Sequence, residues 1–85
     1  MLSVTFTQEA LTHLNDWRTS DPKILAKIVA LITDIATNPF TGLGKPEPLK
    51  HQLKGKWSRR ITDEHRLVYM VQDNTIIVLS CRYHY

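Results

Sequence analysis

The sequence predicts one small α+β domain, residues 1–85, in which two N-terminal helices pack on a mainly antiparallel sheet of four to five strands. Three observations predict this fold. The chain has 85 residues, a length that suits a single compact domain. Helical periodicity is confined to the first half, whereas strand-like segments fill the second half. The resulting order, β-α-α-β-β-β, implies helices packed against one face of a sheet.

The first half predicts one strand and two helices. Residues 2–6 alternate apolar and polar side chains, as a strand does. Thr7 is a suitable N-cap for the first helix. Asp21–Pro22 supplies an N-cap and a first-turn proline for the second helix. This helix is predicted to end at Asn38–Pro39, because a residue before proline avoids helical geometry. Its apolar stripe is formed by Leu25, Ile28, Ile32 and Ile35.

The second half predicts a loop followed by a strand meander. Residues 39–48 are expected to form the loop, because they contain three prolines and two glycines. The segments after it are rich in β-branched and aromatic residues, and short polar links join them as in hairpins. Since the helices cover one sheet face, the other face is the expected functional site. The predicted strands span residues 57–62, 66–72 and 75–82.

The charge of the chain is unevenly distributed. Residues 1–40 hold three Lys/Arg and four Asp/Glu, whereas residues 41–85 hold eight and four. Six of the basic residues lie between Lys45 and Arg60, with Glu47 as the one acid. A cluster of this sign attracts polyanions such as nucleic acid. The alternatives are a binding surface for an acidic protein or a solvated face without a partner. No apolar run approaches the roughly 18 residues that span a bilayer. We therefore expect a cytoplasmic protein without a membrane segment.

Glu47 is the first candidate catalytic residue. It lies between Pro46 and Pro48, which restrict the backbone on either side. Lys45 and Lys50 lie nearby in the sequence. A carboxylate held in a stiff frame among cations suits a general base. The alternative is a surface loop in which Glu47 only offsets the charge of its lysines.

Arg66 and the chain end supply further candidates. Arg66 is expected on the less apolar face of its strand, where a guanidinium can hold a phosphate through two parallel hydrogen bonds. The chain ends in Tyr83, His84 and Tyr85. Histidine moves protons near neutral pH, and tyrosine rings stack on exposed bases. The alternative is that Tyr83 caps the core and the last two residues are disordered.

Three other residues are interpreted as bystanders. Cys81 is the single cysteine and lies in an apolar run, so a small hydrophobic residue on a strand is expected. His65 is interpreted as a packed histidine. His13 is interpreted as a solvent-exposed side chain without a partner.

Together the candidates fit cleavage of RNA by its own 2′-hydroxyl. That reaction needs a base for the hydroxyl, an acid for the leaving 5′-oxygen, and cations for the phosphorane. The sequence offers no carboxylate cluster and no pair of histidines four residues apart that would hold a metal. We therefore expect a site that uses neither metal nor cofactor.

Five strings of residues are specific when taken in this order and in a chain of this length. They are NPF at 38–40, GLGKPEPLKH at 42–51, WSRRI at 57–61, EHRLVY at 64–69 and CRYHY at 81–85. These strings resemble the YoeB branch of the RelE toxin superfamily. The resemblance covers nearly the whole chain and is densest from residue 38 onward.

This resemblance implies the toxin of a type II toxin–antitoxin system. Such a toxin is a ribosome-dependent mRNA endonuclease that cuts a translated codon in the ribosomal A site and stops protein synthesis. The implied partners are the ribosome, mRNA and a YefM-type antitoxin that inhibits the toxin. Operator DNA would be bound only through the toxin–antitoxin complex. A homodimer is compatible with the resemblance.

The resemblance also implies a role for each candidate residue. Glu47 corresponds to the general base and His84 to the general acid. Arg66 corresponds to the cation that stabilises the phosphorane, with Lys50 in support, and Tyr85 positions the substrate. The weaker candidates for RNA contacts are Lys45, Lys50, His51 and Arg59.

Two other functional classes are compatible with the residues alone. One is a non-catalytic RNA- or ribosome-binding module, in which the basic stretch binds and the histidine and glutamate are incidental. The other is a DNA-binding repressor subunit. It is disfavoured because no predicted helix is basic, and the second helix carries only Lys23 and Lys27.

Overall fold

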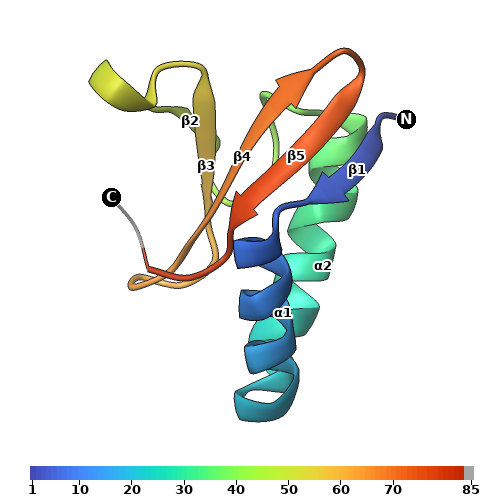
Figure 1. Cartoon of the computed structure of the whole chain (residues 1–85), viewed down its shortest axis with the longest axis vertical. Coiled ribbons are helices and arrows are strands. Elements are labelled where there is room, and N and C mark those ends of the chain that lie inside the picture. The colour runs from blue at the N-terminus through green and yellow to red at the C-terminus, as the bar shows by residue number, and fades with distance from the viewer. Residues whose placement is uncertain (84–85) are drawn as a thin grey trace.

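The computed structural model describes residues 1–83 and consists of two helices on one face of a five-stranded mixed sheet (Figure 1). The strand order is β1-β5-β4-β3-β2. β1 runs parallel to β5, and every other pair of neighbours is antiparallel. The predicted fold class is therefore confirmed. The elements are β1 (Ser3–Phe6), α1 (Gln8–Ser20), α2 (Pro22–Thr37), β2 (Glu47–Pro48), the 3-10 helix η1 (His51–Leu53), β3 (Lys56–Arg60), β4 (Arg66–Gln72) and β5 (Thr75–Ser80).

Both helices begin at the predicted caps. The Oγ1 atom of Thr7 accepts a hydrogen bond from the backbone N–H of Ala10 at 3.1 Å. The carboxylate of Asp21 accepts from the N–H of Lys23 at 3.2 Å, and Pro22 occupies the first turn of α2. These bonds satisfy donors that a helix leaves unpaired at its N-terminus. Within residues 1–83, neither helix has the length and apolar character that crossing a membrane requires.

The core lies between the helices and the β4–β5 part of the sheet. Ile28, Leu31 and Ile35, one stripe of α2, are fully buried. Their sheet partners in the core alternate along the strands, as expected for a face buried on one side only. Figure 1 shows both helices beside β1 and β5, whereas β2 and β3 lie at the far edge. The buried strand residues of this core are Leu67, Tyr69, Ile76 and Val78.

Three predicted boundaries were wrong. β3 spans Lys56–Arg60 rather than residues 57–62. Glu47–Pro48 lies within the predicted loop, yet it pairs with Trp57–Ser58 as the edge strand β2. Proline is tolerated there because the outer side of an edge strand needs no donor. β5 ends at Ser80 rather than at Arg82, because side chains of α1 bind the backbone of the next residue, Cys81.

Candidate active site on the distal sheet face

The strand register brings Glu47 and Arg66 to the same face of the sheet. Residues directly opposite each other on neighbouring strands project to the same side. Glu47 lies opposite Ser58, which lies opposite Val68, and Arg66 is two residues from Val68 on β4. This side is opposite the helix-covered face that holds Leu67 and Tyr69. We call it the distal face and define it by Glu47, Ser58, Arg60, Arg66 and Val68.

The distal face has a buried floor and a charged rim. Val68 is fully buried and Ser58 nearly so, whereas Glu47 is exposed and Arg66 is half-buried. From usual strand spacing and rise, the Cα atoms of Glu47 and Arg66 are about 12 Å apart. Among residues 1–83 neither side chain forms a salt bridge. A carboxylate and a guanidinium therefore face the same space without neutralising each other.

The Arg66 side chain is fixed by the turn that precedes β4. Its Nη1 atom donates to the backbone oxygens of Thr62 at 2.6 Å, Asp63 at 3.2 Å and His65 at 3.1 Å. In the described part of the chain, Nε and Nη2 make no hydrogen bond. A guanidinium held by one nitrogen with other donors available suits recognition of a phosphate oxygen pair.

Tyr83, the last described residue, contacts the backbone of Arg66. The backbone N–H of Arg66 donates to the carbonyl oxygen of Tyr83 at 2.9 Å. Tyr83 is exposed and has a φ of 58°, a left-handed conformation that costs a non-glycine residue about 1–2 kcal/mol. His84 and Tyr85, which follow directly, lie outside the described residues, so their expected roles stay predictions.

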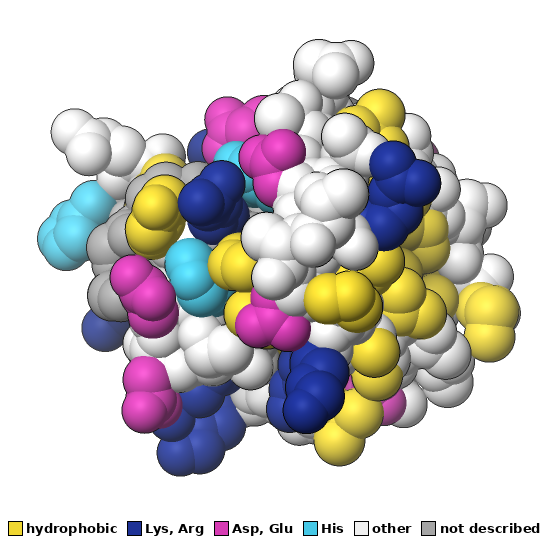
Figure 2. Space-filling view, turned by 90° about the horizontal axis from the view of Figure 1, so that it is seen from below, with side chains coloured by type: hydrophobic (Ala, Val, Ile, Leu, Met, Phe, Trp, Pro, Cys, Tyr) yellow, Lys and Arg dark blue, Asp and Glu magenta, His cyan; other side chains and the backbone are white. Residues whose placement is uncertain are grey.

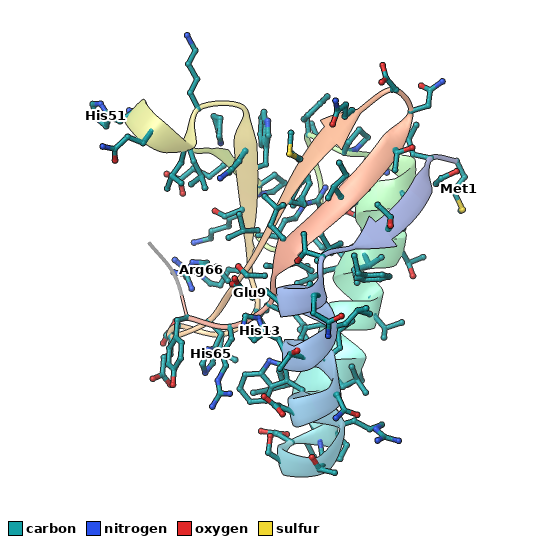
Figure 3. All side chains as sticks on the ribbon, in the orientation of Figure 1. Met1, Glu9, His13, His51, His65 and Arg66 are labelled. Atoms are coloured by element: carbon teal, nitrogen blue, oxygen red, sulfur yellow. The ribbon has the colours of Figure 1, made fainter. Side chains whose placement is uncertain are left out.

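The other predicted RNA-binding residues lie on the loop and on η1. Lys45, Lys50 and His51 are all exposed. His51 lies at the tip of η1, well away from Arg66 (Figure 3). In the view of Figure 2, acidic side chains are interspersed with the basic ones. These positions suit contacts with an extended polyanion more than contacts with one reacting phosphate.

Arg59 does not fit its expected contact with RNA. Its side chain is fully buried on the helix-covered face. Its five N–H donors go to the chain itself, so none is available to a ligand. Arg59 is thus the structural anchor of the loop that covers β3. The acceptors are the carboxylate of Asp34, the hydroxyl of Tyr69, and the backbone oxygens of Asn38, Thr41 and Leu43.

Arg60 is a candidate site residue that the sequence did not single out. It lies directly opposite Arg66 on the distal face, and its side chain is 44% exposed. Like charges directly opposite each other repel, which makes the pair receptive to an anion. The strand alternation of WSRRI carried this signal, because Trp57 and Arg59 share one face and Ser58 and Arg60 the other.

The Arg59 anchor predicts a large effect on stability. Arg59→Met should lower the melting temperature by more than roughly 10 °C, because the Asp34 carboxylate and the loop carbonyls lose their donors. Arg60→Met, the matched control on the exposed face, should change it by only a few degrees. Thermal unfolding followed by circular dichroism measures both. Equal effects of the two substitutions would contradict the assignment of Arg59 as the anchor.

The same anchor gives the stability a defined pH dependence. The hydrogen bond from Arg59 and that from the Leu43 N–H hold the pKa of the Asp34 carboxyl below its usual range. A lowered pKa contributes stability at neutral pH that is lost as acidification protonates the carboxyl. Asp34→Asn should therefore flatten the acid limb of the unfolding curve. Unfolding monitored between pH 7 and pH 2 tests this.

The structure agrees with the interpretation of His65 and Cys81 as packed residues, but not with that of His13 as a side chain without a partner. His65 is buried and packed, as expected. Cys81 is buried too, and burial raises the pKa of its thiol to about 12, so it stays protonated and is not a nucleophile. The interpretation of His13 was wrong, because its Nδ1 atom accepts a hydrogen bond from the Cys81 N–H at 3.0 Å.

Sequence comparison finds relatives along the whole chain. A family model described as the YoeB-like toxin of bacterial type II toxin-antitoxin systems matches residues 6–85. Toxin YoeB of Escherichia coli K12 is 49% identical over 84 residues, which covers 99% of this chain and 100% of that protein. Toxin YoeB of Streptomyces coelicolor is also 49% identical over 84 residues, with the same coverage.

Structure comparison agrees. The chain is similar to a YoeB/ParE toxin from Agrobacterium tumefaciens, with a TM-score of 0.96, 42% identity, and coverage of 99% of this chain and 100% of that one. It is similar to a YoeB dimer from Staphylococcus aureus, with a TM-score of 0.91, 46% identity and coverage of 99% and 98%. It is also similar to a chain of the heterotetrameric YoeB-YefM toxin-antitoxin complex from the same species. The TM-score is 0.90 and the sequence identity 45%, with coverage of 100% of this chain and 99% of that one.

Proposed function

The chain belongs to the YoeB-like toxins of bacterial type II toxin–antitoxin systems, and from this premise we propose that it is an mRNA endonuclease that acts on the ribosome. In this proposal it cuts translated mRNA in the ribosomal A site, in the cytoplasm, and so stops protein synthesis. The observation that carries the proposal is the distal face, where Glu47 and Arg66 project from the same side of the sheet and the carbonyl oxygen of Tyr83 accepts a hydrogen bond from the Arg66 N–H.

The proposed reaction is an in-line attack within the RNA. Glu47 takes the proton of the 2′-hydroxyl, and the 2′-oxygen forms a bond to the adjacent phosphorus. Arg66 donates to the oxygens of the phosphorane, with Lys50 adding positive charge. The bond from phosphorus to the 5′-oxygen then breaks, and His84 gives that oxygen a proton. Tyr85 holds the substrate in position.

Arg60 takes the place of Arg59 in this proposal. It faces the same side as Arg66 and is exposed, whereas Arg59 is buried. We assign Arg60 to the phosphate backbone beside the cut, and Lys45 and His51 to more distant RNA contacts.

This mechanism predicts the chemistry of the ends. The upstream fragment should carry a 2′,3′-cyclic phosphate or its 3′-phosphate product, and the downstream fragment a 5′-hydroxyl. Cleavage should persist when EDTA removes metal from the assay buffer after ribosomal complexes are formed and crosslinked. Ligation assays that discriminate 5′-hydroxyl from 5′-phosphate ends measure this. Ends with a 5′-phosphate would contradict 2′-oxygen attack and indicate an activated water.

We also propose that a YefM-type antitoxin binds this chain and masks the distal face, and that operator DNA is contacted only through that complex. Two observations support this. The chain is similar to the toxin of the YoeB-YefM complex from Staphylococcus aureus, and its exposed basic side chains can recruit an acidic, partly disordered segment. Because the chain is also similar to a YoeB dimer from Staphylococcus aureus, the proposal includes a homodimer of this chain.

Co-expression tests the antitoxin proposal. The chain expressed alone should arrest growth, and the product of the adjacent gene should restore growth and bind the purified chain. A folded chain that is harmless alone, or a neighbour that neither binds nor inhibits, would contradict it.

The second candidate is a non-catalytic RNA- or ribosome-binding module. It is favoured by the exposure of Lys45, Lys50 and Lys54 along one stretch of chain, which suits polyanion binding without chemistry. The two candidates differ in the response to changes at His84. Such changes abolish cleavage but leave affinity intact in the enzyme, and they leave every activity unchanged in the binding module.

A further inference from the structure

The last described residues are held by side chains rather than by a strand. His13 and Trp17, one turn apart on α1, both bind the peptide groups of Cys81. The Nδ1 atom of His13 accepts from the Cys81 N–H at 3.0 Å, and the Nε1–H of Trp17 donates to the Cys81 oxygen at 2.9 Å. β5 ends here, so these bonds replace the pairing that a neighbouring strand would supply.

Tyr83, two residues later, is held in the same way. The Nδ1 atom of His65 accepts from the Tyr83 N–H at 2.8 Å, and the Arg66 N–H donates to the Tyr83 oxygen at 2.9 Å. His65 is itself fixed, because it is only 7% exposed and its ring meets the Trp17 ring edge-on at 4.8 Å. His13 and His65 therefore capture alternate backbone amides of one segment, and both lie at the Arg66 end of the sheet (Figure 3).

The side chain of Arg82 adds to this attachment. Its guanidinium lies 5.5 Å from the centre of the Trp17 ring and 5.3 Å from that of Tyr83, and 3.5 Å from the Asp16 carboxylate. Chain ends are usually frayed. Here every residue from 81 to 83 is bound to α1 or to the start of β4.

The backbone at Tyr83 adopts a left-handed conformation directly before His84. Its φ of 58° is one that non-glycine residues adopt only when their surroundings impose it. The imposed bend lies immediately before His84 in the sequence. Hydrogen bonds at both the N–H and the oxygen of Tyr83 hold this bend.

We propose that His13 and His65 are positioning residues, which hold the backbone of residues 81–83 beside Arg66, directly before His84 in the sequence, by accepting the backbone N–H groups of Cys81 and Tyr83. Both imidazoles act through an unprotonated Nδ1, so the ring proton lies on Nε2. The Nε2 atom of His65 lies 3.4 Å from the Glu64 carboxylate, which favours that tautomer. The catalytic consequence rests on the proposed function, because His84 is the acid being positioned.

The test uses paired substitutions in the full-length protein. His65→Leu removes the acceptor, whereas His65→Asn keeps an oxygen near the place of Nδ1. Amide hydrogen exchange by NMR in the free protein measures the hydrogen bond directly. His65→Leu should speed exchange of the Tyr83 amide by about tenfold, the size of one net hydrogen bond. His65→Asn should leave it within about threefold of the unsubstituted chain.

Single-turnover cleavage on programmed ribosomes measures the consequence. His65→Leu should lower the maximal rate constant by about tenfold while the half-saturating toxin concentration stays unchanged, because the lost interaction orients the acid rather than binding RNA. His65→Asn should restore most of the rate. Thr12→Ala, beside His13 on the exposed side of α1, should change neither readout.

His13→Leu and His13→Asn form a second pair, read at the Cys81 amide, and they carry the test if His65→Leu fails to fold. Faster exchange with an unchanged cleavage rate would overturn the positioning role. Unchanged exchange in both leucine variants would overturn the hydrogen bonds themselves. Protected amides in a wild-type chain that cuts no RNA would instead overturn the proposed function.

Discussion

His84→Gln should reduce cleavage on ribosomes by roughly 10²–10⁴-fold, the usual cost of losing a general acid. Glutamine keeps the approximate size and hydrogen-bonding capacity of the side chain but cannot deliver a proton. The chain up to Tyr83 is attached through His13, Trp17, His65 and Arg66. The substitution should therefore leave the melting temperature almost unchanged.

The measurement is a single-turnover rate on ribosomes programmed with a defined mRNA, together with a thermal melt of the same preparation. His84→Gln should also retain binding to the ribosome at the affinity of the unsubstituted chain. Near-normal cleavage by a folded variant would remove His84 from the mechanism.

Arg66→Ala should be more damaging to cleavage than Lys50→Ala. Removing a donor aimed at developing charge costs about 2.7–4 kcal/mol in comparable oxyanion sites, or roughly 10²–10³-fold in rate. The fixed guanidinium supports this size, since three backbone oxygens hold its Nη1 atom in one orientation. Lys50→Ala should reduce the cleavage rate less, because that side chain is exposed beside η1. A flexible ammonium is also less well oriented toward a phosphate oxygen than a fixed guanidinium.

Arg66→Lys separates charge from geometry. It keeps the positive charge but cannot reproduce the planar fork of donors, so it should recover only a small part of the lost rate. Single-turnover cleavage by the three variants ranks them. A larger loss for Lys50→Ala than for Arg66→Ala would mean that the contact to the phosphorane is assigned to the wrong residue.

Local signals in the sequence were sufficient for most of the fold. Thr7 and Asp21 cap their helices as predicted, and β4 spans the predicted residues 66–72. Caps and apolar periodicity depend on near neighbours, so they can be read directly from sequence. The strand Glu47–Pro48 was missed because two prolines argue against regular structure, and only pairing with β3 makes that segment a strand.

Long-range contacts decided the parts of the site that were not predicted. Arg59 and Arg60 are adjacent residues of the same type, but they project to opposite faces of the sheet. The side chain of Arg59 donates to backbone carbonyl oxygens of the loop, whereas Arg60 lies on the distal face. His13 acquires its partner from a residue 68 positions away. No local pattern predicts a contact over that distance, whereas the alternation along residues 57–61 was enough to separate the face of Arg59 from that of Arg60. Similarly, the alternation along 66–72 correctly predicted the face of Arg66.

Cleavage of translated mRNA by this chain can be tested with a transcriptome-wide map of mRNA 5′ ends after brief induction of the chain in growing cells. If the chain cuts translated mRNA on the ribosome, new 5′-hydroxyl ends should appear within translated reading frames, at a fixed position relative to the A-site codon. These ends should be absent when the Arg66→Ala variant is induced. Growth arrest without new mRNA ends, or ends that persist in untranslated messages and in the Arg66→Ala variant, would contradict this proposal.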